Sequence, residues 1–120
     1  TVLNEGEILT AVRIPNTWAN AEFYFEKVAD RNVWDFALVN VAAAFRTSGE
    51  NIEDARIVCG AVECVPRRLE DVEAAVRGQS RSDSTANSVA EMATAGARPL
   101  NYNNFKVPLM QNLVKRAIRG

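Results

Sequence analysis

Histidine is absent from this chain of 120 residues, and cysteine occurs only twice. Without histidine the chain cannot form a Ser-His-Asp site, a Cys-His site or a metal site built on imidazole. The two cysteines, Cys59 and Cys64, are too few for the disulfide framework of a small secreted domain. A structural metal site needs about four such ligands, so we expect no metal site. We expect two free thiols, one buried in a strand and one in a loop.

Other absences exclude further classes of function. The sequence contains no glycine-rich phosphate loop, and no apolar run approaches the roughly 20 residues of a membrane span. The net charge is −1, from 14 basic and 15 acidic residues, which gives no general attraction to nucleic acid or to anionic membranes. No signal peptide is visible. The low cysteine content suits a reducing compartment, so we expect a cytoplasmic protein. The chain starts at Thr1 without an initiator methionine, and we expect it to be a piece of a longer polypeptide.

The first half of the chain is rich in strand signals. Four segments alternate apolar and polar residues or contain many β-branched and aromatic residues, namely Glu7–Pro15, Glu22–Ala29, Phe36–Thr47 and Ile52–Val62. The three alanines of the third segment would also suit a helix. The polar turn "SGEN" that follows favours a hairpin of two strands instead. Gly60, inside the last segment, indicates a bulge or a close approach of neighbouring atoms.

Helix signals replace strand signals in the second half. The three candidate helices carry apolar stripes at helical spacing and lie within Arg67–Gly78, Ser82–Pro99 and Val107–Gly120. Strands followed by helices are typical of an α+β domain. The charges of "RRLEDVE", Arg67 to Glu73, predict a solvated helix face. None of the acids Glu63, Glu70, Asp71 and Glu73 has a base or nucleophile beside it, so we expect no catalytic residue.

One charged island interrupts the apolar stretch between Phe23 and Phe45. It contains Lys27, Asp30, Arg31 and Asp35. A polar loop joining two strands, with Arg31 paired to Asp30 or to Asp35, would explain these charges. A site that faces a ligand or another domain would explain them as well. The residues alone leave both interpretations open.

Taken in order, four stretches resemble one known family. They are "EILTAVRIP", "FEKVADR…DFALVNVAAAF", "IEDARIVCGAVECVPRRLEDVEAAVRG" and "RPLNYNNFKVPLMQNLVKRAI". Together they look like the C-terminal domain of the FAD-binding medium subunit of molybdenum hydroxylases, the family of carbon monoxide dehydrogenase and xanthine dehydrogenase. The most specific elements are the Ile14-Pro15 strand end, the spacing from Lys27 to Arg31 and Asp35, and Gly60 followed by Pro66. The "VEC" before Pro66 departs from the small apolar residues usual in the family.

The resemblance implies a fold, cofactors and partners. The fold would be a small antiparallel sheet of three main strands, with a possible fourth, packed against three helices. Residues 1–120 would be a single C-terminal domain that covers one side of the flavin, and a missing N-terminal part would bind most of the FAD. A molybdenum-binding large subunit and an iron–sulfur small subunit with 2Fe-2S clusters would be its partners in electron transfer. By position, Lys27 and Leu9 would approach the FAD. A docking module without flavin contact is the alternative.

Overall fold

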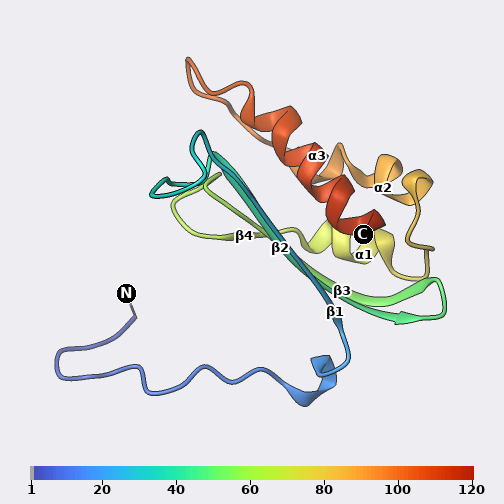
Figure 1. The fold of residues 1–120 in the computed structure, drawn as a ribbon, viewed down its shortest axis with the longest axis horizontal. Helices are drawn as coiled ribbons and strands as arrows, with labels where there is room; N and C mark the ends of the chain where they lie inside the picture. Colours follow the sequence, from blue (N-terminus) through green and yellow to red (C-terminus); the bar gives the residue numbers. More distant parts are fainter. Residues whose placement is uncertain (1) are drawn as a thin grey trace.

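The computed structural model describes residues 2–120 as an antiparallel sheet covered on one face by helices (Figure 1). The strands follow one another across the sheet in chain order and are β1 (Glu22–Val28), β2 (Val39–Ser48), β3 (Asn51–Gly60) and β4 (Arg67–Arg68). The helices are α1 (Glu70–Val76), α2 (Asp83–Val89) and α3 (Lys106–Arg119), with the 3₁₀ turns η1 (Asn16–Trp18) and η2 (Met92–Thr94). This arrangement confirms the predicted α+β class. None of these helices is long and apolar enough to cross a bilayer.

The core lies between the sheet and the helices. Every second residue of β2 from Val39 to Phe45 is buried, and so is every second residue of β3 from Ala55 to Cys59, as expected for a sheet with one covered face. The helices and the residues next to them bury most of the apolar stripes that the sequence predicts: Leu69, Val72 and Val76; Ala86, Val89, Ala90 and Ala93; and Met110, Leu113, Val114 and Ala117. Leu109, which belongs to the last predicted stripe, is only half-buried against the core. The removal of these apolar side chains from water is the main stabilising contribution to the fold.

The two long strands form the predicted hairpin. The chain turns at Gly49, whose φ of 61° lies in the left-handed region that glycine adopts without strain. The register between β2 and β3 shifts between Arg46 and Thr47, so the bulge lies there and not at Gly60. Gly60 shows the close approach instead. A Cβ at this position would lie 2.5 Å from Oδ1 of Asn40, so a larger residue would require the Asn40 side chain to move.

The prediction of a strand at Glu7–Pro15 is wrong for this structure. Residues 2–17 are exposed, and between residues 8 and 14 no backbone hydrogen bond joins this segment to any other part of residues 2–120. Alternation alone does not make a strand, because a strand also needs a partner for its backbone groups. The fourth strand is β4 instead, which pairs Arg68 with Val58 and Arg67 with Cys59.

The candidate helix over Ser82–Pro99 is shorter than predicted. Ser82 caps α2 by accepting a hydrogen bond from the backbone N–H of Thr85 at 3.3 Å. The helix ends at Val89, and the chain continues through η2 into an irregular loop. Gly96 in that loop has a φ of 75°, a left-handed conformation that is incompatible with a helix running on to Pro99.

The prediction of a solvated face for "RRLEDVE" is wrong at one residue. Glu73 is 3% exposed, although Glu70 and Asp71 on the same helix are exposed. Its carboxylate accepts hydrogen bonds from the backbone N–H of Ile57 at 2.9 Å and from Nε and NH2 of Arg68 at 3.0 and 2.7 Å. The bond to Glu73 raises the pKa of the Arg68 guanidinium further. Glu73 therefore ties α1 to both β3 and β4.

Candidate functional site

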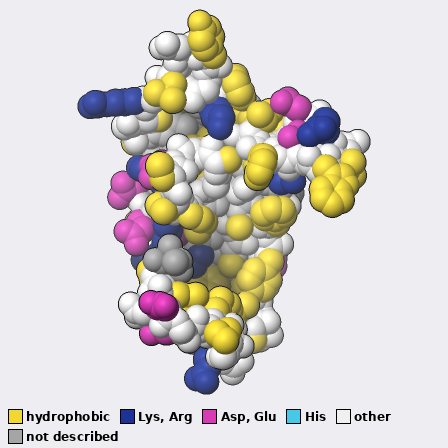
Figure 2. Space-filling view, turned by 90° about the vertical axis from the view of Figure 1, so that its left-hand side faces the viewer, with side chains coloured by type: hydrophobic (Ala, Val, Ile, Leu, Met, Phe, Trp, Pro, Cys, Tyr) yellow, Lys and Arg dark blue, Asp and Glu magenta, His cyan; other side chains and the backbone are white. Residues whose placement is uncertain are grey.

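The face of the sheet opposite the helices, called the open face below, carries the candidate site. Strand alternation directs the side chains of β1 outward at Phe23, Phe25 and Lys27, and the two phenylalanines are 66% and 67% exposed. The neighbouring outward positions include the small or short side chains of Ala42 and Ala44 on β2 and Val58 on β3, while the Asn40 side chain of β2 lies over Gly60. Viewed from this side of the molecule, hydrophobic side chains gather near the centre and charged ones lie mainly at the margins (Figure 2). The open face is thus a low apolar surface bordered by aromatic rings.

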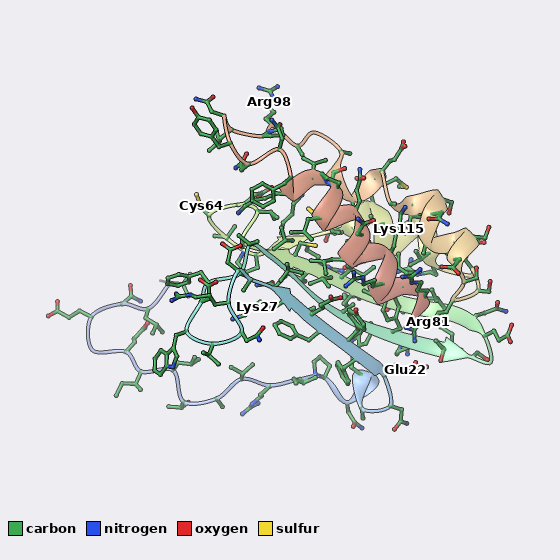
Figure 3. The ribbon with its side chains drawn as sticks, turned by 45° about the horizontal axis from the view of Figure 1, so that its top comes forward. Glu22, Lys27, Cys64, Arg81, Arg98 and Lys115 are labelled. Atoms are coloured by element: carbon green, nitrogen blue, oxygen red, sulfur yellow. The ribbon has the colours of Figure 1, made fainter. Side chains whose placement is uncertain are left out.

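Lys27 lies at the end of β1, where the strand meets the loop of residues 29–38 (Figure 3). Its ammonium group donates a hydrogen bond to the backbone carbonyl of Asp35 at 2.9 Å. The loop is closed at its base by the N–H of Leu38, which donates to the carbonyl of Val28 at 2.7 Å. An ammonium has three donors, so this contact leaves two of them for another acceptor. Lys27 can therefore brace the loop and still present positive charge at the edge of the open face.

Arg31 and Asp35 hold the same loop together. Asp35 Oδ2 accepts a hydrogen bond from the backbone N–H of Arg31 at 2.9 Å, and the guanidinium lies 3.8 Å from the carboxylate. The guanidinium also donates to the carbonyl of Trp34 at 2.9 Å. Of the two pairings that the sequence allowed for Arg31, the structure forms the one with Asp35. These contacts fix Trp34 at a φ of 55°, a strained conformation for a tryptophan.

The loop exposes apolar side chains rather than burying them. Val33 is 69% exposed, Trp34 is 95% exposed and Phe36 is 94% exposed. Exposed apolar side chains of this size on a braced loop make it a candidate surface for contact with a ligand or another part of the protein. Lys27, which is bonded to Asp35, connects this loop to the open face.

Leu9 is not brought to Lys27 by any contact in residues 2–120. It lies in the extended N-terminal segment and is 66% exposed. The structure therefore joins Lys27 with Arg31 and Asp35, and it leaves Leu9 apart from them. The proposed roles of Leu9 and Lys27 toward a cofactor stay predictions.

A cluster that sequence reasoning missed lies near η1. The ring of Trp18 stacks on two guanidinium groups, at 5.7 Å from Arg46 and 4.9 Å from Arg56. Arg46 Nε is buried without a hydrogen-bond partner in the described part of the chain. The alternation of β2 and β3 does place both arginines on the outward side, but only the fold brings Trp18 over them.

The two thiols are free, as predicted. Cys59 is fully buried in β3, and burial raises the pKa of its thiol to about 12, so it stays protonated and unreactive at neutral pH. Cys64 is exposed in the connection between β3 and β4. No three His, Cys, Asp or Glu side chains within residues 2–120 are grouped so that they could hold a metal ion.

The chain matches the family model of the CO dehydrogenase flavoprotein C-terminal domain over residues 24–120. It is 30% identical over 99 residues to the glyceraldehyde dehydrogenase medium chain of Sulfolobus acidocaldarius, covering 82% of this chain and 34% of that protein. It is 33% identical over 109 residues to the aldehyde oxidoreductase FAD-binding subunit PaoB of Escherichia coli, covering 91% of this chain and 31% of that subunit. The chain thus spans about a third of the length of these relatives.

Solved structures show the same fold. The quinoline 2-oxidoreductase of Pseudomonas putida 86 superposes with a TM-score of 0.75 at 29% identity, over 82% of this chain and 36% of that one. The carbon monoxide dehydrogenase of Hydrogenophaga pseudoflava superposes with a TM-score of 0.74 at 27% identity, over 83% of this chain and 36% of that one. By the family model, which covers most of its length, this chain belongs to the CO dehydrogenase flavoprotein C-terminal domain family, in the flavoproteins of the molybdenum hydroxylases.

Proposed function

We propose that the chain is the C-terminal domain of an FAD-binding subunit and that its open face covers one side of the flavin. The observation that carries the proposal is Lys27, a cation that makes one hydrogen bond within residues 2–120 and is held at the edge of a low apolar surface, where its other donors can meet a ligand. The curated relative PaoB is named an FAD-binding subunit. Since the chain spans only about a third of such relatives, we propose that a preceding part of the polypeptide binds most of the FAD.

The residues of the open face fit a flat ring system. Ala42 and Ala44 present little side-chain bulk above the sheet, while Phe23 and Phe25 stand exposed at one edge. Such a surface can lie against an isoalloxazine ring, and a lysine at its margin can favour negative charge on the ring or on the phosphates. When bound, the flavin supplies one- and two-electron redox chemistry. The chain's own contribution is to cover the ring, exclude water from it and hold a positive charge near it.

The parent enzyme is proposed to be a multi-subunit molybdenum oxidoreductase. In that assembly a molybdenum-binding large subunit would oxidise the substrate and a small subunit with 2Fe-2S clusters would pass electrons to the FAD. The relatives are named a glyceraldehyde dehydrogenase, an aldehyde oxidoreductase and a carbon monoxide dehydrogenase, and these names support an oxidoreductase of the aldehyde or carbon monoxide type. The alternative, a docking module without flavin contact, would use the same surface to bind another subunit only.

The test is a set of three alanine variants in the complete subunit. Lys27→Ala should lose flavin, because a charge-assisted hydrogen bond contributes about 1.5–3 kcal/mol, which corresponds to roughly ten- to over a hundredfold in affinity. Arg31→Ala should lower the melting temperature more than the flavin content, because Arg31 braces the loop through Trp34 and Asp35.

Lys106→Ala is the matched control. Lys106 Nζ also donates to a backbone carbonyl, that of Ala61, at 2.9 Å, but it lies at the start of α3 in the helical layer. The measurements are the ratio of FAD to protein and the melting temperature. If Lys27→Ala keeps as much flavin as Lys106→Ala, the proposed role of Lys27 is refuted. A complete wild-type subunit without any flavin would favour the docking module.

A further inference from the structure

Three residues form a row across one end of the open face. Lys27 of β1 pairs with Asn40 of β2, and Asn40 pairs with Gly60 of β3. Residues directly opposite each other on antiparallel strands have Cβ atoms about 4.5–5.5 Å apart. A single ligand on this end of the sheet can therefore touch Lys27 and Asn40 together.

The side chain of Asn40 lies over Gly60 because glycine leaves that space free. A Cβ on Gly60 would come within 2.5 Å of Oδ1 and 3.0 Å of Nδ2 of Asn40. The Asn40 side chain is half-buried and makes no hydrogen bond within residues 2–120. A carboxamide has two donor hydrogens and an acceptor oxygen. The fold holds this group in place and leaves its donors and its acceptor to a ligand.

The row borders a hollow in the open face. The hollow has a volume of about 430 Å³, within the range of roughly 300–1,000 Å³ that is typical of small-molecule sites. It is lined by residues of β2, of β3 and of the β3–β4 connection, among them Asn40, Ala42, Val58, Gly60, Glu63 and Cys64. Figure 3 shows Cys64 and Lys27 at the same end of the sheet. Glu63 is already paired with Arg67, so the unpaired polar group at this hollow is the Asn40 carboxamide.

We propose that the Asn40 carboxamide hydrogen-bonds the pyrimidine edge of the flavin, and this rests on the proposed function. The pyrimidine edge of an isoalloxazine carries two carbonyl oxygens with the N3–H between them, whereas the dimethylbenzene edge has no hydrogen-bonding group. A carboxamide matches the pyrimidine edge, because it donates to a carbonyl and accepts from N3–H. Lys27 in the same row favours the negative charge that a reduced flavin carries near N1. Asn40 thereby sets which edge of the ring lies beside Lys27.

The first test compares Asn40→Ala with Asn51→Ala in the complete subunit. Asn51 is the matched control, because it has the same side chain but is exposed at the start of β3, at the other end of the sheet. Asn40→Ala should raise the dissociation constant of FAD about three- to thirtyfold, the effect of one or two neutral hydrogen bonds. Asn51→Ala should leave it unchanged. Equal dissociation constants in the two variants overturn the proposal.

The second test uses N3-methyl FAD, which lacks the N3–H donor. The wild-type subunit should bind this analogue about three- to tenfold more weakly than FAD. Asn40→Ala should discriminate less between the two flavins, because the acceptor of the N3–H is already gone. Equal discrimination by the wild type and by Asn40→Ala overturns the proposal, because Asn40 would then act on the fold and not on the ring. If Asn40→Ala fails to fold, equal affinities of the wild type for FAD and for N3-methyl FAD overturn the proposal.

The wild-type titration with FAD separates this inference from the proposed function. A wild-type subunit that binds FAD no more tightly than Asn40→Ala does would refute the role of Asn40 and keep the proposed function. A complete wild-type subunit that binds no FAD would refute the proposed function, and the role of Asn40 with it.

Discussion

Replacing Glu73 with alanine tests whether the buried carboxylate joins the helical layer to the sheet. The change removes the acceptor of the Ile57 N–H, which lies in the core, and the partner of the Arg68 guanidinium. A buried donor left without an acceptor costs about 1–3 kcal/mol. Breaking a fully buried ion pair costs about 3–5 kcal/mol, but the Arg68 side chain is 45% exposed and can turn to water. We expect a loss of about 2–4 kcal/mol in the free energy of unfolding.

Two further variants make the prediction selective. Glu73→Gln keeps an oxygen that can accept from Ile57 and loses only the charge, so it should cost about 1–2 kcal/mol. Glu70→Ala is the control on the same helix. Its carboxylate lies 3.3 Å from Arg68 but its side chain is 74% exposed, so its loss should stay below about 1 kcal/mol.

The assay is urea denaturation of the wild type and the three variants, followed by circular dichroism. The urea concentration at the unfolding midpoint should be lowered least by Glu70→Ala, more by Glu73→Gln and most by Glu73→Ala. The dependence of the unfolding free energy on urea concentration should stay constant. A Glu73→Ala variant no less stable than Glu70→Ala would refute the reasoning, because the carboxylate would then contribute no more than a surface pair.

Three more outcomes follow from the core. A thiol reagent should label Cys64 rapidly in the native protein and Cys59 only after denaturation; two rapid equivalents would contradict the burial of Cys59. Burial raises the pKa of Cys59 to about 12 and also raises the pKa of Tyr24. The stability tied to their neutral forms is therefore complete below about pH 9 and is lost as the pH rises toward 12. In Cys59→Ala the urea midpoint should depend less on pH in this range than in the wild type, and an unchanged dependence would contradict this. Arg81→Ala should lower the unfolding free energy by about 1–3 kcal/mol, because Arg81 donates to the last carbonyls of α3 and lies 4.7 Å from the Phe45 ring. Arg119→Ala removes only an exposed ion pair and should change the unfolding free energy by less than about 1 kcal/mol. Equal losses in the two variants would refute the role of Arg81.

Local periodicity was enough to predict most of the fold. The strands around "SGEN" and the stripes of the helices bury the predicted residues, because each pattern is set by its own segment and one covered face. The burial of Glu73 could also have been read from spacing. Glu73 follows Leu69 by four residues and precedes Val76 by three, so it lies on the apolar face of the helix. Its charge concealed that position.

Features that depend on distant partners could not be predicted from the sequence. The strand β4 consists of two arginines without any apolar pattern, and it pairs where Arg68 meets Glu73. The position of Lys27 at a strand end was predictable, but its acceptor is a backbone carbonyl of a loop with a positive φ at Trp34. The stacking of Trp18 depends on the register of β2 and β3, which no local pattern contains.

If the open face covers the flavin as proposed, the two faces of the sheet separate stability from function in this domain. On the helical face, side chains such as Phe45 and Ile57 are fully buried, and truncating them removes both transfer free energy and packing. On the open face, Phe25 is 67% exposed, so most of its surface already lies in water when the domain is folded. Truncating Phe25 therefore removes little of the free energy of folding. A variant such as Phe25→Ala that keeps its melting temperature but loses flavin or a subunit contact reports on the function of the open face alone.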